Sequence, residues 1–134
     1  MSTKTKLIIT GYNGYIGKCL IKFLRERKIN FVKLDLSKKK ILFKNFTHLI
    51  HLQFYIDNKK SNYKRNILEM EKVVDICLKN KLFLIFPSTA SFSFNNKTRV
   101  NDNLKIFNNY TKAKDACEKI ILKCNKLYNL NYTI

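Results

Sequence analysis

Residues 10–17 read TGYNGYIG and follow directly on the apolar run at residues 7–9. A buried strand, a glycine turn and then a helix form the context in which glycines hold the phosphates of a dinucleotide. Gly11 permits the tight turn, Gly14 lets backbone N–H groups approach a diphosphate, and Gly17 lets the helix pack closely on the sheet. We therefore interpret the stretch as a diphosphate-binding turn at a helix N-terminus, against the alternative of a purely structural turn.

A carboxylate follows the next apolar stretch, residues 30–36. Asp35 comes 18 residues after Gly17, where an acidic side chain can accept hydrogen bonds from the hydroxyls of an adenosine ribose. The same charge repels a 2′-phosphate, which favours NAD over NADP. The lysines at 38–40 could offset that repulsion, and a surface aspartate without a ligand is the alternative interpretation.

Apolar periodicity predicts alternating strands and helices along the whole chain. This alternation is typical of a parallel sheet with helices on both faces, an α/β three-layer fold in one domain over residues 1–134. Residues 41–46 are ambiguous, with Ile41–Phe43 as a short extra strand, and residues 93–109 resemble a loop. We expect strands at 5–10, 30–36, 47–53 and 82–87, a further strand beginning in 129–134, and helices at about 16–28, 62–80 and 109–127.

Length and composition favour a cytoplasmic domain without a membrane span or a leader sequence. The chain has 134 residues, 46% of them hydrophobic, and no apolar run approaches the ~18 residues of a transmembrane helix. Four cysteines, at 19, 77, 117 and 124, lie in apolar helical patterns without metal-ligand spacing. We expect them to be reduced, buried thiols, and we expect no metal site.

The net charge of +18 is a weak indication of nucleic-acid binding. Lysines outnumber arginines 23 to 4 and are spread along the chain, whereas dedicated nucleic-acid binders use the arginine fork. Asn, Ile, Phe and Tyr are also abundant, a combination that AT-rich coding produces. Salt-dependent nucleic-acid binding is therefore the less favoured alternative, and the positive field favours small anions.

Two further stretches, FPSTAS at residues 86–91 and YTKAK at residues 110–114, point to a family. Together with the glycine turn they resemble the extended short-chain dehydrogenase/reductases, within them the NAD-dependent epimerase/dehydratase group, over about residues 5–134. The resemblance implies a Rossmann fold with a mostly parallel sheet, NAD as cofactor and a nucleotide sugar as substrate. It also implies an oxidoreductase or isomerase that transfers a hydride between the sugar and the nicotinamide.

Tyr110 and Lys114 share one helix face because they are four residues apart. A neighbouring ammonium favours the phenolate form of a tyrosine, which can then exchange a proton with a sugar hydroxyl. The resemblance implies that Lys114 also holds the nicotinamide ribose and that Asn66 has a structural or relay role. It implies that Thr89 bonds the reacting oxygen, with Ser88 as its neighbour and Ser91 as the less favoured substitute. It implies a cofactor site formed by Gly11, Tyr12, Asn13, Gly14, Tyr15, Ile16, Gly17, Asp35, Leu52 and Lys114.

The sequence departs from the family pattern at several places near the cofactor. Gln53–Phe54 replaces a pair of small residues, Glu69–Met70 replaces Gly-Thr, and no acid for the adenine lies between Asp35 and Asp57. The chain also stops at Ile134, where relatives continue into the region that binds the substrate. We expect that C-terminal substrate region to be missing, with an exposed sheet edge that favours a homodimer or a complementing polypeptide.

Two functions follow from these features. The first is a nucleotide-sugar epimerase, dehydratase or reductase that uses Tyr110, Lys114 and Thr89. The second is a non-catalytic dinucleotide-binding module that lacks a substrate domain. The residues do not identify the sugar or the reaction.

Overall fold

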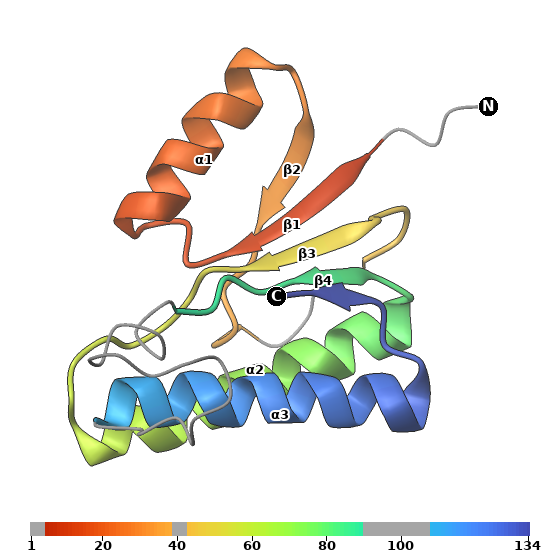
Figure 1. The fold of residues 1–134 in the computed structure, drawn as a ribbon. Coiled ribbons are helices and arrows are strands. Elements are labelled where there is room, and N and C mark those ends of the chain that lie inside the picture. The colour runs from red at the N-terminus through yellow and green to blue at the C-terminus, as the bar shows by residue number, and fades with distance from the viewer. Residues whose placement is uncertain (1–4, 39–42, 90–107) are drawn as a thin grey trace, which may run out of the picture.

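The computed structural model describes residues 5–38, 43–89 and 108–134. Within them the chain forms five strands and three helices, which alternate except that β3 follows β2 without a described helix between them (Figure 1). The elements are β1 (Lys6–Thr10), α1 (Tyr15–Glu26), β2 (Asn30–Lys33), β3 (His48–His51), α2 (Lys60–Asn80), β4 (Phe83–Ile85), α3 (Asn109–Tyr128) and β5 (Tyr132–Thr133).

All strand pairs of the sheet are parallel, in the order β2-β1-β3-β4-β5. β1 lies between β2 and β3, and the chain passes from it first to the edge strand β2 and then, after crossing back, to β3. The carboxyl ends of β1 and β3 are therefore adjacent at the point where the strand order reverses. Ligands of parallel α/β sheets bind at such a switch point, which locates the candidate site.

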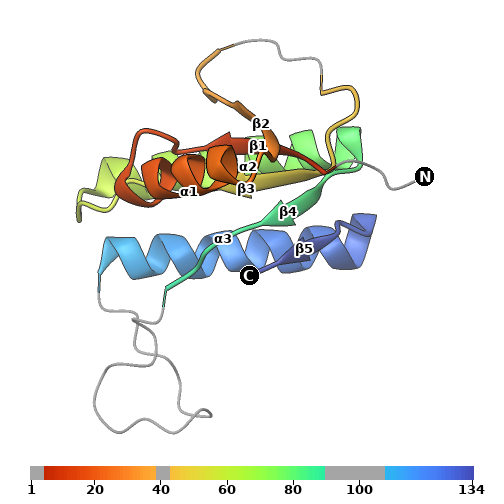
Figure 2. The same cartoon turned by 90° about the horizontal axis from the view of Figure 1, so that it is seen from above.

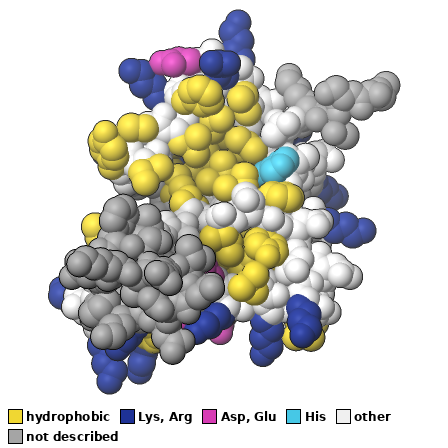
Figure 3. Space-filling view, in the orientation of Figure 1, with side chains coloured by type: hydrophobic (Ala, Val, Ile, Leu, Met, Phe, Trp, Pro, Cys, Tyr) yellow, Lys and Arg dark blue, Asp and Glu magenta, His cyan; other side chains and the backbone are white. Residues whose placement is uncertain are grey.

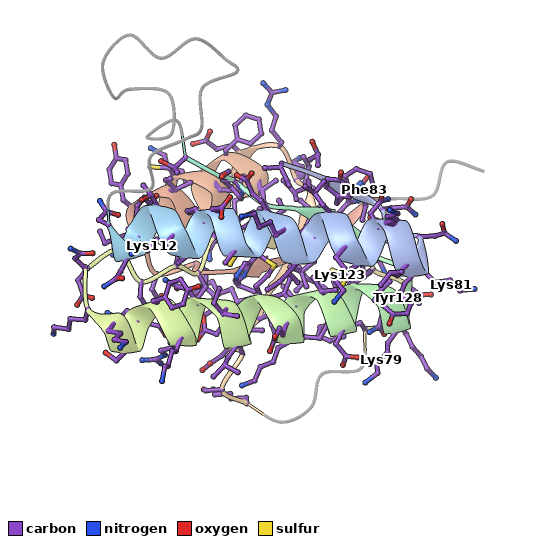
Figure 4. The ribbon with its side chains drawn as sticks, turned by 60° about the horizontal axis from the view of Figure 1, so that its bottom comes forward. Lys79, Lys81, Phe83, Lys112, Lys123 and Tyr128 are labelled. Atoms are coloured by element: carbon purple, nitrogen blue, oxygen red, sulfur yellow. The ribbon has the colours of Figure 1, made fainter. Side chains whose placement is uncertain are left out.

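The helices cover both faces of the sheet, as the alternating pattern predicts. α1 lies on one face, and α2 and α3 pack side by side on the other (Figures 1 and 4). The larger core forms on the α2–α3 face, where Ile8, Leu49 and Leu84 of the strands meet Met70 and Ile121 of the helices. Alternate residues of a strand face opposite sides, so the neighbours of these strand residues build the second core under α1.

The second core is smaller and leaves part of the sheet open. Leu7, Ile9 and Ile50 pack against Ile21 and Leu24 of α1. Seen from above, α1 lies over the β1 end and does not cover β4 and β5 (Figure 2). Hydrophobic side chains accordingly gather on this face in the space-filling view (Figure 3).

The predicted elements are confirmed, and the strands are shorter than expected. The expected strand at 30–36 ends at Lys33, and the last hydrogen bond to β1 is donated by the Leu34 backbone N–H to the Ile9 carbonyl at 2.8 Å. The structure gives Phe43 no strand conformation, while 39–42 and most of the expected loop at 93–109 lie outside the described residues. The expectation of four buried thiols is wrong for Cys19, which is exposed on α1.

Candidate functional site

A cavity of about 250 Å³ lies at the carboxyl ends of β1 and β3. The glycine turn forms one wall, the segment after β2 forms another, and residues after β3 and on α2 close it. The lining residues are Thr10, Gly11, Tyr12, Asn13, Gly14, Leu34, Asp35, Leu36, Ser37, Gln53, Tyr55, Arg65 and Glu69.

The glycine turn is shaped by close backbone contacts that exclude a side chain at two of its three glycines. Gly11 has a φ of +66°, and a Cβ there would lie 2.4 Å from the backbone of Gln53. A Cβ on Gly17 would lie 2.3 Å from the carbonyl oxygen of Gly11. A Cβ on Gly14 would meet nothing closer than 3.4 Å, so Gly14 is required by neither conformation nor packing.

The N-terminus of α1 opens from this turn without a side-chain cap. Gly14 is the N-cap residue, and the first turn contains no acidic side chain. The backbone N–H groups at a helix start and the positive end of the helix dipole favour an anion. Because Gly14 also lines the cavity, these groups and the cavity fit the diphosphate of a nucleotide.

Asp35 faces the glycine turn from the end of β2. Its Oδ1 accepts hydrogen bonds from the backbone N–H of Ser37 at 3.0 Å and from the Ser37 hydroxyl at 2.6 Å. These two bonds lower the pKa of Asp35, so the carboxylate is ionised at neutral pH. An ionised carboxylate on the cavity wall can accept hydrogen bonds from ribose hydroxyls.

The third wall is formed by Gln53 and Tyr55, which follow β3, and Asn66 holds it in place. Asn66 is 2% exposed; its Oδ1 accepts from the Tyr55 backbone N–H at 2.9 Å, and its Nδ2 donates to the Tyr55 carbonyl at 3.0 Å. Gln53 donates to the Tyr55 hydroxyl at 3.0 Å, and that hydroxyl lies 3.3 Å from Glu69 Oε1. Asn66 therefore holds a cavity wall in place.

Two charged side chains of α2 complete the cavity beside Tyr55. The guanidinium of Arg65 lies 4.1 Å from the centre of the Tyr55 ring, and its Nε lies 3.6 Å from Glu69. Burial raises the pKa of Glu69, and its Oε2 has no hydrogen-bond partner among the described residues. The cavity therefore contains an acid, Glu69, whose negative charge is only partly balanced by Arg65.

Lys114 lies on the other side of that wall, buried among aromatic rings. Its Nζ donates to the Pro87 carbonyl at 2.7 Å and lies 4.0, 4.4 and 6.0 Å from the ring centres of Phe54, Phe86 and Tyr110. Burial lowers the pKa of Lys114 to about 8. A lysine with such a pKa exchanges its proton near neutral pH.

The first turn of α3 positions Tyr110 one helical turn before Lys114. Asn108 caps the helix by accepting from the Thr111 backbone N–H at 2.8 Å, and the Thr111 side chain completes the capping box. The Tyr110 ring is half-buried and packs edge-on against Phe54, with ring centres 5.6 Å apart.

The structure brings some predicted site residues together and leaves others apart. Gly11, Tyr12, Asn13, Gly14 and Asp35 line one cavity, whereas Tyr110 and Lys114 form a separate cluster around Phe54. Tyr15 and Ile16 are exposed on α1, and Leu52 packs in the core under α1. Thr89 is half-buried beyond β4, Ser88 donates a hydrogen bond to Glu118, and Ser91 lies outside the described residues.

Sequence reasoning missed Tyr55, Arg65 and Ser37 as cavity residues. Ser37 could have been found from Asp35, because an Asp followed two residues later by Ser is typical of a local side-chain turn. Tyr55 and Arg65 come from different elements, and nothing in their spacing indicates that they stack.

Comparisons with known proteins agree with this geometry. A parallel sheet with a glycine turn at its switch point defines a Rossmann-type dinucleotide-binding fold. Residues 7–134 match the NAD dependent epimerase/dehydratase family, and the chain belongs to that family.

The similar proteins include one with a different curated activity. The chain is 30% identical to a 4-hydroxy-tetrahydrodipicolinate reductase of Buchnera aphidicola, over 84% of this chain and 44% of that protein. A UDP-N-acetylglucosamine 4-epimerase from Methanobrevibacter ruminantium superimposes on the chain with a TM-score of 0.78 at 18% sequence identity. A Thermus thermophilus UDP-glucose 4-epimerase in complex with NAD superimposes with a TM-score of 0.75 at 19% sequence identity. Each superposition includes 96% of this chain but only 53% of the epimerase chain, so this chain spans about half the length of these relatives.

Among the described residues, no helix is both long and apolar enough to cross a membrane. The same residues contain no group of three or more His, Cys, Asp or Glu side chains that could hold a metal ion.

Proposed function

We propose that the chain binds a nicotinamide dinucleotide in the cavity at the carboxyl ends of β1 and β3, with NAD preferred to NADP. The cavity that joins the glycine turn to Asp35 is the observation that carries this proposal. A diphosphate fits the uncapped start of α1, and ribose hydroxyls fit the carboxylate held by Ser37. The NAD-complexed epimerase among the similar structures supports the same ligand.

Isothermal titration calorimetry with NAD and NADP tests this proposal. The wild-type chain is expected to bind NAD more tightly, because the ionised Asp35 repels a 2′-phosphate. In Asp35→Asn the preference is expected to shrink by about tenfold, which corresponds to the loss of one charged contact. A wild-type chain that binds neither dinucleotide contradicts the proposal.

A second candidate function is catalysis on nucleotide sugars, for which we propose Tyr110 as the proton-exchanging group. The observation in its favour is that Tyr110 and Lys114 lie on one face of α3 beside the carboxyl end of β4. A bound nicotinamide would supply the hydride acceptor. Thr89 would orient the sugar oxygen, and the substrate would bind in a homodimer or with a complementing polypeptide.

Turnover with UDP- and GDP-sugars separates the two candidates. If Tyr110 exchanges the proton, Tyr110→Phe is expected to lose turnover and keep NAD affinity. NAD binding without turnover in the wild-type chain selects the non-catalytic module. The free thiols of Cys77 and Cys117 fit a cytoplasmic setting for either function.

A further inference from the structure

The segment Gln53–Tyr55 separates the nucleotide cavity from Lys114. The side chains of Gln53 and Tyr55 line the cavity, while the ring of Phe54, between them in sequence, contacts the Lys114 ammonium at 4.0 Å. Phe54, Tyr110 and Lys114 do not line the cavity. The wall between the cavity and Lys114 is therefore a single segment of the chain, residues 53–55.

This wall is fixed from both ends. Asn66 bonds both the N–H and the carbonyl of Tyr55, and the Gln53 backbone N–H lies 3.3 Å from the Thr10 hydroxyl. Asn66 and Thr10 are both almost completely buried. Moving the backbone of Phe54 away from Lys114 would break these bonds, so the position of this segment is set by the fold.

Lys114 already has its partners on its own side of the wall. An ammonium has three N–H donors, and one of them is bonded to Pro87. The faces of Phe54 and Phe86 cover the remaining charge, and such contacts are strongest when the cation is desolvated. Lys114 and Phe86 are buried, whereas Phe54 and Tyr110 are half-buried, so the latter two rings form the outer cover.

The volume of the cavity agrees with a site that is separated from Lys114. Its volume of about 250 Å³ is below the roughly 300–1,000 Å³ of pockets that enclose a drug-sized ligand. The groups it offers, the glycine turn and Asp35, suit one ribose and a diphosphate. Among the described residues, its lining contains no lysine that could hold a second ribose.

We propose that the cavity accepts the nucleoside diphosphate half of a dinucleotide, and that Phe54 keeps Lys114 from contacting the part attached to the second phosphate. This inference rests on the proposed nucleotide binding and specifies its ligand class. ADP and ADP-ribose are then ligands as good as NAD, and Lys114 acts as a structural cation within its aromatic cage.

Calorimetry with NAD, ADP-ribose and ADP tests the inference in the wild-type chain and in Phe54→Ala. In the wild type the dissociation constants for NAD, ADP-ribose and ADP are expected to agree within about threefold, a difference below that of one hydrogen bond to a charged group. Phe54→Ala exposes the Lys114 ammonium, so NAD and ADP-ribose, which both carry a second ribose, are expected to gain about tenfold over ADP. Phe46→Ala is the matched control, because Phe46 is a half-buried ring that packs on Phe43 before β3.

Three results overturn the inference. They are a wild-type chain that binds NAD or ADP-ribose more than about tenfold tighter than ADP, a Phe54→Ala variant with the wild-type ratio of affinities for NAD and ADP, and a control that changes this ratio as Phe54→Ala does. A wild-type chain that binds none of the three nucleotides refutes the proposed nucleotide binding itself.

Acetylation of lysines, measured by mass spectrometry on the wild-type chain, tests the inference without any variant. Lys112, which is exposed on α3 (Figure 4), is the internal reference. With its pKa at about 8, an accessible Lys114 would acetylate faster than an ordinary lysine. Slow acetylation of Lys114, with no greater protection by NAD or ADP-ribose than by ADP, is expected. Fast acetylation, or protection by NAD and ADP-ribose but not by ADP, contradicts the inference.

Discussion

The Nδ1 atom of His51 lies 2.7 Å from the hydroxyl oxygen of Thr10, and this bond joins the carboxyl ends of β3 and β1 directly beneath the cavity. Both residues are 1% exposed, and the His51 ring stacks on Phe86. The Thr10 hydroxyl also accepts from the Gln53 backbone. The His51–Thr10 pair thus connects the glycine turn with the wall that follows β3.

We predict that His51 makes the chain sensitive to mild acid. Burial, with a smaller contribution from Lys114, lowers the pKa of His51 to about 3 from an unfolded value of 6.5. The unfolded chain therefore binds one more proton between these values. Stability is complete above pH 6.5 and falls by up to about 1.4 kcal/mol per pH unit as the pH drops towards 3.

His51→Gln provides the comparison for this prediction, because a neutral amide can still pair with Thr10. Urea unfolding between pH 4 and 7 is expected to show a steeper loss in the wild type than in the variant. The carboxylates titrate equally in both proteins, so equal slopes would show that His51 does not cause the acid sensitivity.

The three glycines of the turn are predicted to respond differently to alanine. Gly11→Ala and Gly17→Ala place a Cβ within 2.4 Å of backbone atoms, and each is expected to cost more than about 3 kcal/mol of stability. Gly14→Ala is expected to keep the melting temperature within a few degrees, because a Cβ there meets nothing closer than 3.4 Å, and to lose nucleotide affinity, because Gly14 lines the cavity. Thermal melting and ADP titration measure the two effects; unchanged affinity in Gly14→Ala would place the diphosphate elsewhere.

Local patterns of the sequence were sufficient for the fold and for half of the candidate site. The glycine turn and Asp35 each follow an apolar strand at a recognisable spacing, so the sequence pattern predicts them. Phe54, Phe86 and Lys114 come from three separate segments, and only the packed structure shows that they form a cage. The replacement of a small pair by Gln53–Phe54 was recognisable in the sequence, but the pattern did not predict that Phe54 turns towards Lys114 while Gln53 lines the cavity.

Glu69 is predicted to weaken the binding of anionic nucleotides. It lines the cavity, burial raises its pKa, and above that pKa its charge repels a diphosphate. Glu69→Gln also releases Arg65 from its ion pair, so ADP is expected to bind roughly tenfold more tightly. Asp75→Asn is the matched control, since it removes one exposed acid from the same helix outside the cavity. An equal gain in both variants would indicate net charge as the cause.

Lys114→Met is predicted to stabilise the fold at neutral pH. Burial lowers the pKa of Lys114 to about 8, against about 10.4 for an ordinary lysine, so the folded chain disfavours the charged form. A methionine has similar length, packs well against Phe54 and Phe86, and leaves only the Pro87 carbonyl, on an exposed residue, without its donor. We expect a gain of roughly 1 kcal/mol, because replacing a buried charge by an apolar group is often stabilising.

The pH dependence identifies the cause of that gain. The unfolded chain binds more protons than the folded chain between pH 8 and about 10.4, so wild-type stability rises with pH in this window. The advantage of Lys114→Met is therefore expected to be complete below pH 8 and to disappear as the pH rises towards 10.4. Denaturant unfolding at pH 7, 8.5 and 10 measures it. A Lys114→Met variant that is less stable than the wild type at pH 7 would show that the aromatic cage and Pro87 outweigh the desolvation of the ammonium.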